Sequence, residues 1–345
     1  MIYIYGLICT YLCWVLSRGI IFGRQICLAI GVLSISSIAV FRGDVGTDTL
    51  SYEKIVSDIR EGNDLEGLEV GFSSLIKVFQ LFLVDDRLVV RVLSAVYCLV
   101  LLAYIFRANR NEIFYLFMFY LPSFFYANSM NVLRVGLASS FILLFIQYLR
   151  KDKPLAMALC FLTAIMFHYS SFFLAFYFWV LFGKKNVGQL IHFLIGFLFI
   201  GLLLVYLKLE YFFDKISLYA DYESPSIFSG LGLIFPGFIL MLGVWNSNLP
   251  GSMRVKIICW SLINILFFYS VTIFSYAGLR FLALSFFGLS ISIIVAHSNI
   301  NLKFNLRLCY SFIFAGLFSF LATYNGWLMT FDADGAPFLP YKVFW

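Results

Sequence analysis

Charged residues are scarce in this sequence. Asp, Glu, Lys and Arg together make up only 12% of its 345 residues, whereas a soluble domain carries roughly 25%. This scarcity excludes a globular protein whose whole surface faces water. Hydrophobic residues make up 62% of the chain and aromatic residues 20%. Such a composition predicts an integral membrane protein with aromatic side chains at its interfaces.

Several familiar motifs are also missing. The seven cysteines fall inside apolar runs without metal-ligand spacing, which favours buried packing over a disulfide framework or a metal site. No Walker A loop and no nucleotide-binding glycine pattern is present, which disfavours ATP-driven transport and a nucleotide-sugar enzyme. We therefore expect no cofactor and no metal. The basic residues are scattered through short loops, which gives no support to nucleic-acid binding.

The apolar runs predict an all-α polytopic membrane protein with about twelve transmembrane helices. A helix needs about 20 apolar residues, and about 17 as a minimum, to cross the bilayer core. The predicted spans are residues 1–17, 25–41, 88–106, 112–127, 132–149, 154–168, 170–183, 188–206, 228–245, 257–275, 279–297 and 308–324. A further run, 69–84, carries Lys77 in its middle. Its apolar residues Leu75, Val78, Phe79 and Phe82 have helical spacing, which predicts an amphipathic helix in the interface.

The distribution of charge predicts the topology. With twelve spans, the loops 18–24, 107–111, 150–153, 184–187, 246–256 and 298–307 share one side. That side holds 13 of the 24 basic residues, with Glu112 and Asp152 as its only acids. The positive-inside rule places it in the cytoplasm, so both termini and the segments 42–87, 207–227 and 325–345 are expected in the periplasm. We treat residues 1–345 as a single domain in a bacterial inner membrane.

Four residues that can carry positive charge lie at the outer ends of predicted spans: Arg42, Arg134, His168 and Arg280. A cation near the hydrocarbon boundary is costly unless it is paired or hydrated, which makes it a functional candidate. Arginines that converge would suit a diphosphate, because guanidinium groups bind its oxygens in pairs. The alternative is independent interfacial anchors. His168 is either a general base or a structural hydrogen-bonding residue.

The segment 41–55, FRGDVGTDTLSYEKI, combines acidic, hydroxyl and glycine residues. Its two glycines predict a turn. Thr47 or Asp48 then caps a helix over residues 49–60. Asp44 and Asp48 are candidate bases for a sugar hydroxyl or ligands of a weak cation site. The alternative is a capped amphipathic helix on the outer surface.

Tyrosines in the polar segments are candidate glycan contacts. Tyr219 and Tyr222 lie among acidic residues in 207–227, and Tyr52 lies in the helix expected after the turn. Aromatic rings stack on the apolar faces of sugars, while carboxylates accept hydrogen bonds from sugar hydroxyls. An interfacial amphipathic helix is the alternative for 207–227.

These residues, taken in order, resemble the EpsG/Wzy-type polysaccharide polymerases. The matching motifs are Arg42–Gly43–Asp44–Val45–Gly46–Thr47–Asp48 with Tyr52, then Asn131–Val132–Leu133–Arg134, His168–Tyr169–Ser170, Arg280 opening a late span, and Pro340–Tyr341. One departure is Val135, where the family often has Gln.

The resemblance implies a C-type glycosyltransferase-like fold and an O-antigen, capsule or exopolysaccharide polymerase. Such an enzyme works at the periplasmic face without a nucleotide. It transfers the growing glycan from undecaprenyl diphosphate to the non-reducing end of an incoming lipid-linked repeat unit. The implied partners are the undecaprenyl-diphosphate-linked oligosaccharide, membrane lipid and a chain-length regulator protein. The implied diphosphate contacts are Arg134 and Arg280 with Arg42, and the implied proton acceptor is Asp44, Asp48 or His168.

Other classes of membrane protein would show different patterns in the sequence. A lipid-linked oligosaccharide flippase or transporter would place charges deep in the spans along a central path, whereas the charges here gather at the outer boundary. An O-antigen ligase has the same donor chemistry and differs only in family motifs. A membrane acyltransferase, expected to draw its donor from the cytoplasm, and a purely structural subunit are further alternatives.

Overall fold

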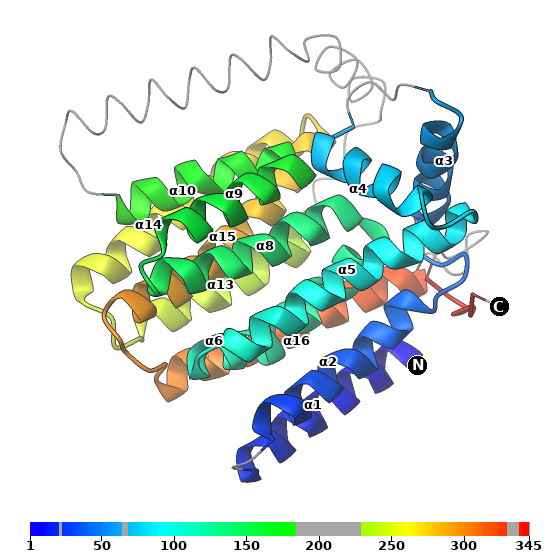
Figure 1. Ribbon diagram of the computed structural model, residues 1–345. Coiled ribbons are helices and arrows are strands. Elements are labelled where there is room, and N and C mark those ends of the chain that lie inside the picture. Colours follow the sequence, from blue (N-terminus) through cyan, green and yellow to red (C-terminus); the bar gives the residue numbers. More distant parts are fainter. Residues whose placement is uncertain (21–22, 64–67, 184–228, 330–337, 345) are drawn as a thin grey trace.

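A computed structural model describes residues 1–20, 23–63, 68–183, 229–329 and 338–344 of the protein. Within these ranges the chain is helical, and its only β pairing is an isolated antiparallel bridge between Arg42 and Val343. The long helices lie side by side in one bundle (Figure 1).

The bundle is built from apolar helices. These are α1 (Ile2–Gly19), α2 (Arg24–Val40), α5 (Asp86–Arg107), α8 (Leu133–Arg150), α9 (Pro154–Phe167), α10 (Phe172–Phe182), α13 (Leu231–Trp245), α14 (Gly251–Thr272), α15 (Tyr276–Asn299) and α16 (Leu306–Met329). By length and composition, six of the described helices can cross a membrane: α1, α5, α8, α14, α15 and α16. The protein is therefore a multi-pass membrane protein. Many side chains on the outer faces of α1 and α16 are exposed apolar groups, among them Leu12, Leu16, Phe314 and Leu321, as expected for helices that face lipid.

Between α5 and α8 the chain forms one uninterrupted helical stretch that changes its winding. Two π-helical segments, η1 (Leu116–Tyr120) and η2 (Ala127–Asn131), alternate with α6 (Arg110–Tyr115) and α7 (Leu121–Tyr126). π-Helical turns are rare and are often found at functional sites. Here η2 leads directly into the start of α8, which carries Arg134.

Eleven of the twelve predicted spans coincide with described helices, and the twelfth, 188–206, lies outside the described residues. The largest difference in a boundary is at α14, which starts at Gly251 rather than at 257 because Pro250 ends the preceding turn and stands at the N-cap. The number of twelve crossings, the compartment of each end and the C-type glycosyltransferase-like fold stay predictions.

Two short helices, α3 (Thr49–Arg60) and α4 (Val70–Gln80), lie at the end of the bundle where both termini also lie (Figure 1). The predicted helix over 49–60 is confirmed. Helix α4 is eleven residues long, too short to cross a bilayer. Phe72 and Ile76 are buried, whereas Val78 and, just after the helix, Phe82 are exposed. The helix packs against α3, α5 and α9, and its position in a membrane interface stays a prediction.

The C-terminal residues 338–344 are bound to the start of the chain. The Gly43 N–H donates to the Lys342 carbonyl at 2.7 Å, and the Phe344 N–H donates to the Phe41 carbonyl at 3.0 Å. The Tyr3 hydroxyl donates to the Phe338 carbonyl at 2.8 Å. These bonds join the beginning of α1 and the end of α2 to the last described residues.

Candidate functional site

The end of the bundle that carries α3 and α4 encloses a cavity of about 290 Å³. Five of the predicted site residues line it: Asp48, Tyr52, Arg134, His168 and Arg280. They come from five separate segments, namely the loop before α3, α3 itself, the first turn of α8, the junction between α9 and α10, and the start of α15. We call this space the outer cavity. The rest of its lining is mostly apolar, and its larger residues include Phe124, Val132, Leu174, Leu233, Leu284 and Phe287.

Glu69 was not predicted as a site residue, but its side chain contacts both Arg134 and His168. It stands at the N-cap of α4 and is only 2% exposed. Arg134 Nη1 donates to Glu69 Oε2 at 2.7 Å. His168 Nδ1 lies 3.1 Å from Glu69 Oε1. A carboxylate facing Nδ1 favours the tautomer with the proton on that nitrogen, which leaves Nε2 as an acceptor. His168 Nε2 is in hydrogen-bond contact with Ser170 Oγ.

The charge of Glu69 is maintained by its neighbours. Burial raises the pKa of this carboxyl, but the hydrogen bond with His168 and the positive charge of Arg134 outweigh burial and hold the pKa below its ordinary value. Glu69 is therefore ionised at neutral pH, and Arg134 has a fixed counter-charge on one of its sides.

A glycine explains how Glu69 comes close to His168. Gly71 lies against the last turn of α9, where a Cβ would stand 2.8 Å from the carbonyl oxygen of Met166. This close approach brings the beginning of α4 against the end of α9. Because His168 caps the end of α9, Glu69 and His168 become neighbours although 99 residues separate them.

Asp48 occupies the N-cap position of α3 without capping it through its side chain. The predicted side-chain cap is therefore not formed. Asp48 Oδ1 accepts a hydrogen bond from Thr47 Oγ1 at 3.2 Å, and Oδ2 accepts none from the described residues. Burial raises the pKa of the Asp48 carboxyl above its ordinary value, and the Thr47 hydrogen bond and the charges of Arg134 and Arg280 offset only part of this effect. A carboxylate of this kind is suited to accept a proton.

The loop that presents Asp48 rests on η2. Asn131 Oδ1 accepts hydrogen bonds from the Asp48 N–H at 3.0 Å and from the Thr47 hydroxyl. Gly46 has φ of +106°, and a Cβ there would meet the Met130 carbonyl oxygen at 2.6 Å. The turn predicted from the glycines is thus present, and Gly46 is needed for both its backbone angle and its contact.

We expect Gly46→Ala to destabilise the protein by about 1–3 kcal/mol, because it adds backbone strain and a collision with Met130. The shifted loop should also lower activity through Asp48. Gly62→Ala is a matched control, since Gly62 also has positive φ, +80°, but has open space around it. Thermal unfolding of the two purified variants checks the prediction. Equal losses in melting temperature would show that the contact with Met130 is unimportant.

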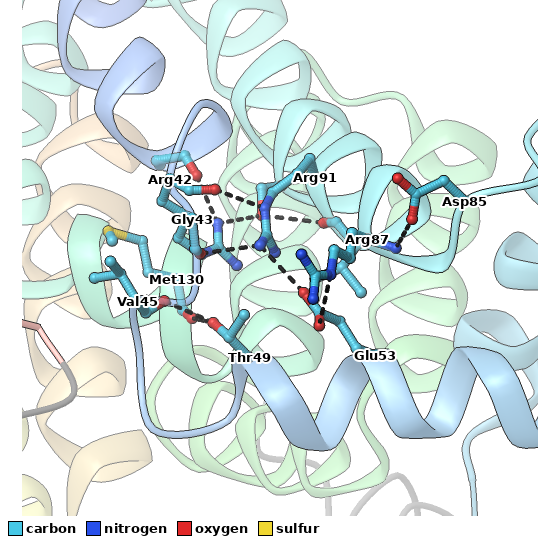
Figure 2. Close-up of polar contacts among 12 residues, drawn as sticks. Arg42, Gly43, Val45, Thr49, Glu53, Asp85, Arg87, Arg91 and Met130 are labelled. Atoms are coloured by element: carbon cyan, nitrogen blue, oxygen red, sulfur yellow. Dashed lines mark hydrogen bonds and ion pairs between the residues drawn. The ribbon is translucent and has the colours of Figure 1, made fainter. Parts of the chain in front are cut away.

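Arg42 and Asp44 do not line the outer cavity. Arg42 is fully buried, and its Nη1 donates to the Ala39 carbonyl at 2.6 Å, to Ser94 Oγ at 2.9 Å and to the Ser129 carbonyl at 3.1 Å. Asp44 is exposed. The structure therefore brings together two of the three arginines expected to converge, and Arg42 instead holds α2, α5 and η2 together (Figure 2).

A second buried arginine, Arg91 of α5, escaped sequence reasoning. Its Nε donates to the Arg42 carbonyl at 2.7 Å and its Nη2 to the Gly43 carbonyl at 2.9 Å. Nη2 also pairs with Glu53 Oε1 of α3 at 3.1 Å (Figure 2). Arg91 thus ties the loop, α3 and α5 to one another. An arginine about one turn into the predicted span 88–106 was the only signal for it.

Two predicted glycan contacts, Tyr219 and Tyr222, lie with segment 207–227 outside the described residues. Tyr52 is 4% exposed, lines the outer cavity and lies against Arg134. Across the described ranges, no group of three or more His, Cys, Asp or Glu side chains could hold a metal ion.

Comparisons with known proteins give one match. The model of the EpsG family matches residues 25–343 of the chain, which includes every segment that lines the outer cavity. No curated protein and no solved structure matches.

Proposed function

The chain belongs to the EpsG family, and from that premise we propose that it is a glycosyltransferase that lengthens a glycan carried on undecaprenyl diphosphate. It would transfer the growing glycan to the non-reducing end of an incoming lipid-linked repeat unit, at the periplasmic face of a bacterial inner membrane. The products would be O-antigen, capsule or a related exopolysaccharide.

The observation that carries this proposal is the pairing of charge with apolar walls in the outer cavity. Arg134 and Arg280 line it together with Asp48, while Leu174, Leu284 and similar residues form the rest. A lipid diphosphate bonded to a sugar has the same division: two phosphates, a polar ring and a hydrocarbon tail. Guanidinium groups fit phosphate oxygens, and the apolar walls keep water from weakening their attraction.

Asp48, Arg134 and Arg280 have different roles in the proposed reaction. Asp48 Oδ2 accepts the proton of the acceptor hydroxyl as its oxygen bonds to the anomeric carbon of the donor sugar. The bond from that carbon to the diphosphate oxygen breaks, and undecaprenyl diphosphate leaves with the electron pair. Arg134 and Arg280 stabilise the charge that develops on the leaving oxygen, and stabilisation of this kind is usually the largest single contribution to catalysis.

Glu69 acts through its neighbours. It holds the Arg134 guanidinium by the 2.7 Å ion pair and orients the His168 ring through Nδ1. Arg134 then keeps one fixed position and does not follow the substrate outward, which is the preorganisation that electrostatic catalysis requires. His168 contributes a polar wall with Nε2 turned to Ser170.

Deletion of the gene, followed by gel analysis of surface glycans, tests the function. A polymerase deletion leaves a product with a single repeat unit. A flippase deletion removes all surface repeats, and a ligase deletion leaves polymer on the lipid carrier. Only the first result supports the proposal.

The acid side of the pH–activity profile identifies the base. Because a base works when deprotonated and the Asp48 pKa is raised, activity should fall at a higher pH than an ordinary aspartate, near pH 3.9, would give. The assay uses purified protein and a lipid-linked repeat unit. We expect Asp48→Asn to abolish this limb along with most activity, and His168→Gln to keep the limb at a lower rate. A limb lost in His168→Gln and kept in Asp48→Asn would assign the base to His168.

A further inference from the structure

The opposite end of the bundle contains a second cavity of about 620 Å³. It lies between the end of α1, the beginning of α2, the beginning of α6, the loop after α15 and the first turns of α16. We call it the basic cavity, because four cationic residues line it: Arg18, Arg24, Arg110 and Lys303. No Asp or Glu is among the described residues that line it.

Within the described part of the chain, the four cations of the basic cavity lack the carboxylate partners that several other arginines have. Arg150 of α8, for example, pairs with Glu112 of α6 at 3.0 Å. At the end with α3 and α4, Arg60, Arg87, Arg91 and Arg134 each have a carboxylate partner. Among the described residues, none of the four cations of the basic cavity forms an ion pair. The Nε of Arg24 is buried and has no hydrogen-bond partner among the described residues. Four like charges around one cavity repel one another, so an anion placed between them is strongly favoured.

Both α1 and α16 contribute residues to the cavity at this end. At the other end they touch, with the ring centroids of Tyr3 and Trp327 5.0 Å apart. At the basic end, residues of both helices face the cavity instead, among them Trp14 on α1 and Tyr310 on α16. The guanidinium of Arg18 lies 4.5 Å from the centroid of the Trp14 ring. Aromatic rings beside cations are typical of the head-group level of a membrane.

The cavity continues onto an apolar surface. Leu306 and Tyr310 line it and are 74% and 57% exposed, and Phe314 follows at 60%. These residues are spaced by four along α16 and therefore share one face of the helix. A ligand in the basic cavity can therefore contact the four cations with one end and the exposed apolar side chains of α16 with its other end.

From this arrangement we propose that the basic cavity binds the phosphate head group of an anionic phospholipid, with the acyl chains along the face of α16 that carries Leu306, Tyr310 and Phe314. The cations supply the charge complementarity and the exposed apolar side chains supply the contact with the chains. Free phosphate would use the cations alone and leave that face without a role.

Lipid binding to the purified full-length protein tests the proposal, by native mass spectrometry and by the rise in melting temperature on lipid addition. The probes are phosphatidylglycerol, phosphatidylcholine and inorganic phosphate. We expect phosphatidylglycerol to bind in preference to phosphatidylcholine. In the double variant Arg18→Gln/Arg24→Gln, its apparent affinity should fall by about tenfold or more, given the attraction that each basic residue contributes at a membrane surface.

The matched control is Lys151→Gln/Lys153→Gln, which removes the same charge from exposed lysines in the α8–α9 turn, outside the cavity. This control should stay within about twofold of the parent protein, because it is outside the site. The double variant Arg110→Gln/Lys303→Gln changes α6 and the loop after α15 instead, and it should show the same loss of phosphatidylglycerol affinity. It keeps the test decisive if Arg18→Gln/Arg24→Gln does not fold. Equal weakening in control and cavity variants, unchanged binding in the cavity variants, or equal stabilisation by inorganic phosphate would each overturn the proposal.

Discussion

We expect an Arg134→Ala variant to form no long-chain polysaccharide when it is produced at the normal level. The side chain lines the outer cavity and is held at 2.7 Å by Glu69, so it can meet a leaving diphosphate without rearranging. Loss of one such electrostatic donor typically lowers the rate by ~10²- to 10³-fold. Arg134→Lys should recover only part of the rate, since an ammonium cannot bind two oxygens in the planar manner of a guanidinium. A gel of surface glycans shows chain length, and the purified enzyme gives the rate.

A structural explanation of that loss can be separated from a catalytic one. Arg134→Ala leaves the buried Glu69 without its cation, which by itself destabilises the protein. The double variant Arg134→Ala/Glu69→Gln removes both charges, so it should regain thermal stability without regaining polymerisation. Glu69→Gln alone provides the reference rate. Recovery of that rate in the double variant would show that Arg134 serves only to neutralise Glu69. Arg60→Ala, which breaks an exposed pair with Asp86 away from the outer cavity, should leave the glycan pattern unchanged.

The largest loss of stability is expected for Arg42→Ala. Removing this fully buried side chain leaves a void and takes the donor away from two carbonyls and a serine hydroxyl. Together these effects should lower the free energy of unfolding by about 3–5 kcal/mol. Arg42→Met keeps most of the volume and loses the hydrogen bonds, so its melting temperature should lie between those of the parent and the alanine variant.

Arg87→Ala is the matched control for Arg42. Arg87 lies nearby in α5 (Figure 2), its side chain is 57% exposed, and its contact with Glu53 is 3.8 Å long. An exposed pair of this kind contributes about 0–1 kcal/mol. Thermal unfolding in one detergent compares the variants. If Arg42→Ala unfolded at the temperature of the control, the internal network would not be what stabilises this end of the bundle, and a role for Arg42 at the substrate would regain weight.

Local patterns in the sequence predicted much of this structure. The apolar runs place the long helices, and the glycine turn followed by Thr47 and Asp48 places α3 with its observed limits. The prediction that Arg134 and Arg280 meet at one end followed from charge counting, because the positive-inside rule orients every helix relative to the others. Five of the predicted site residues line one cavity at that end.

What escaped prediction depends on pairs of residues far apart in the chain. Glu69 resembles an ordinary acid at the start of an amphipathic helix, and only packing at Gly71 reveals its two partners. Arg42 and Arg134 look alike in sequence, since each stands at the outer end of a span. They differ because Arg91 and the C-terminal residues cover the loop at Arg42. Burial that results from contacts between segments far apart in the chain leaves no periodic pattern in the sequence.

The pairing of residues 41–43 with residues 342–344 also has a consequence for the making of the protein. The ribosome synthesises residues 41–43 early and residues 342–344 long afterwards, so this pairing can form only after the helices between them have been synthesised. The contacts that hold the loop at Arg42 and Gly43 in place are therefore completed late in synthesis. A premature stop before residue 338 would yield inserted helices without the hydrogen bonds that join Phe41 and Gly43 to residues 342–344.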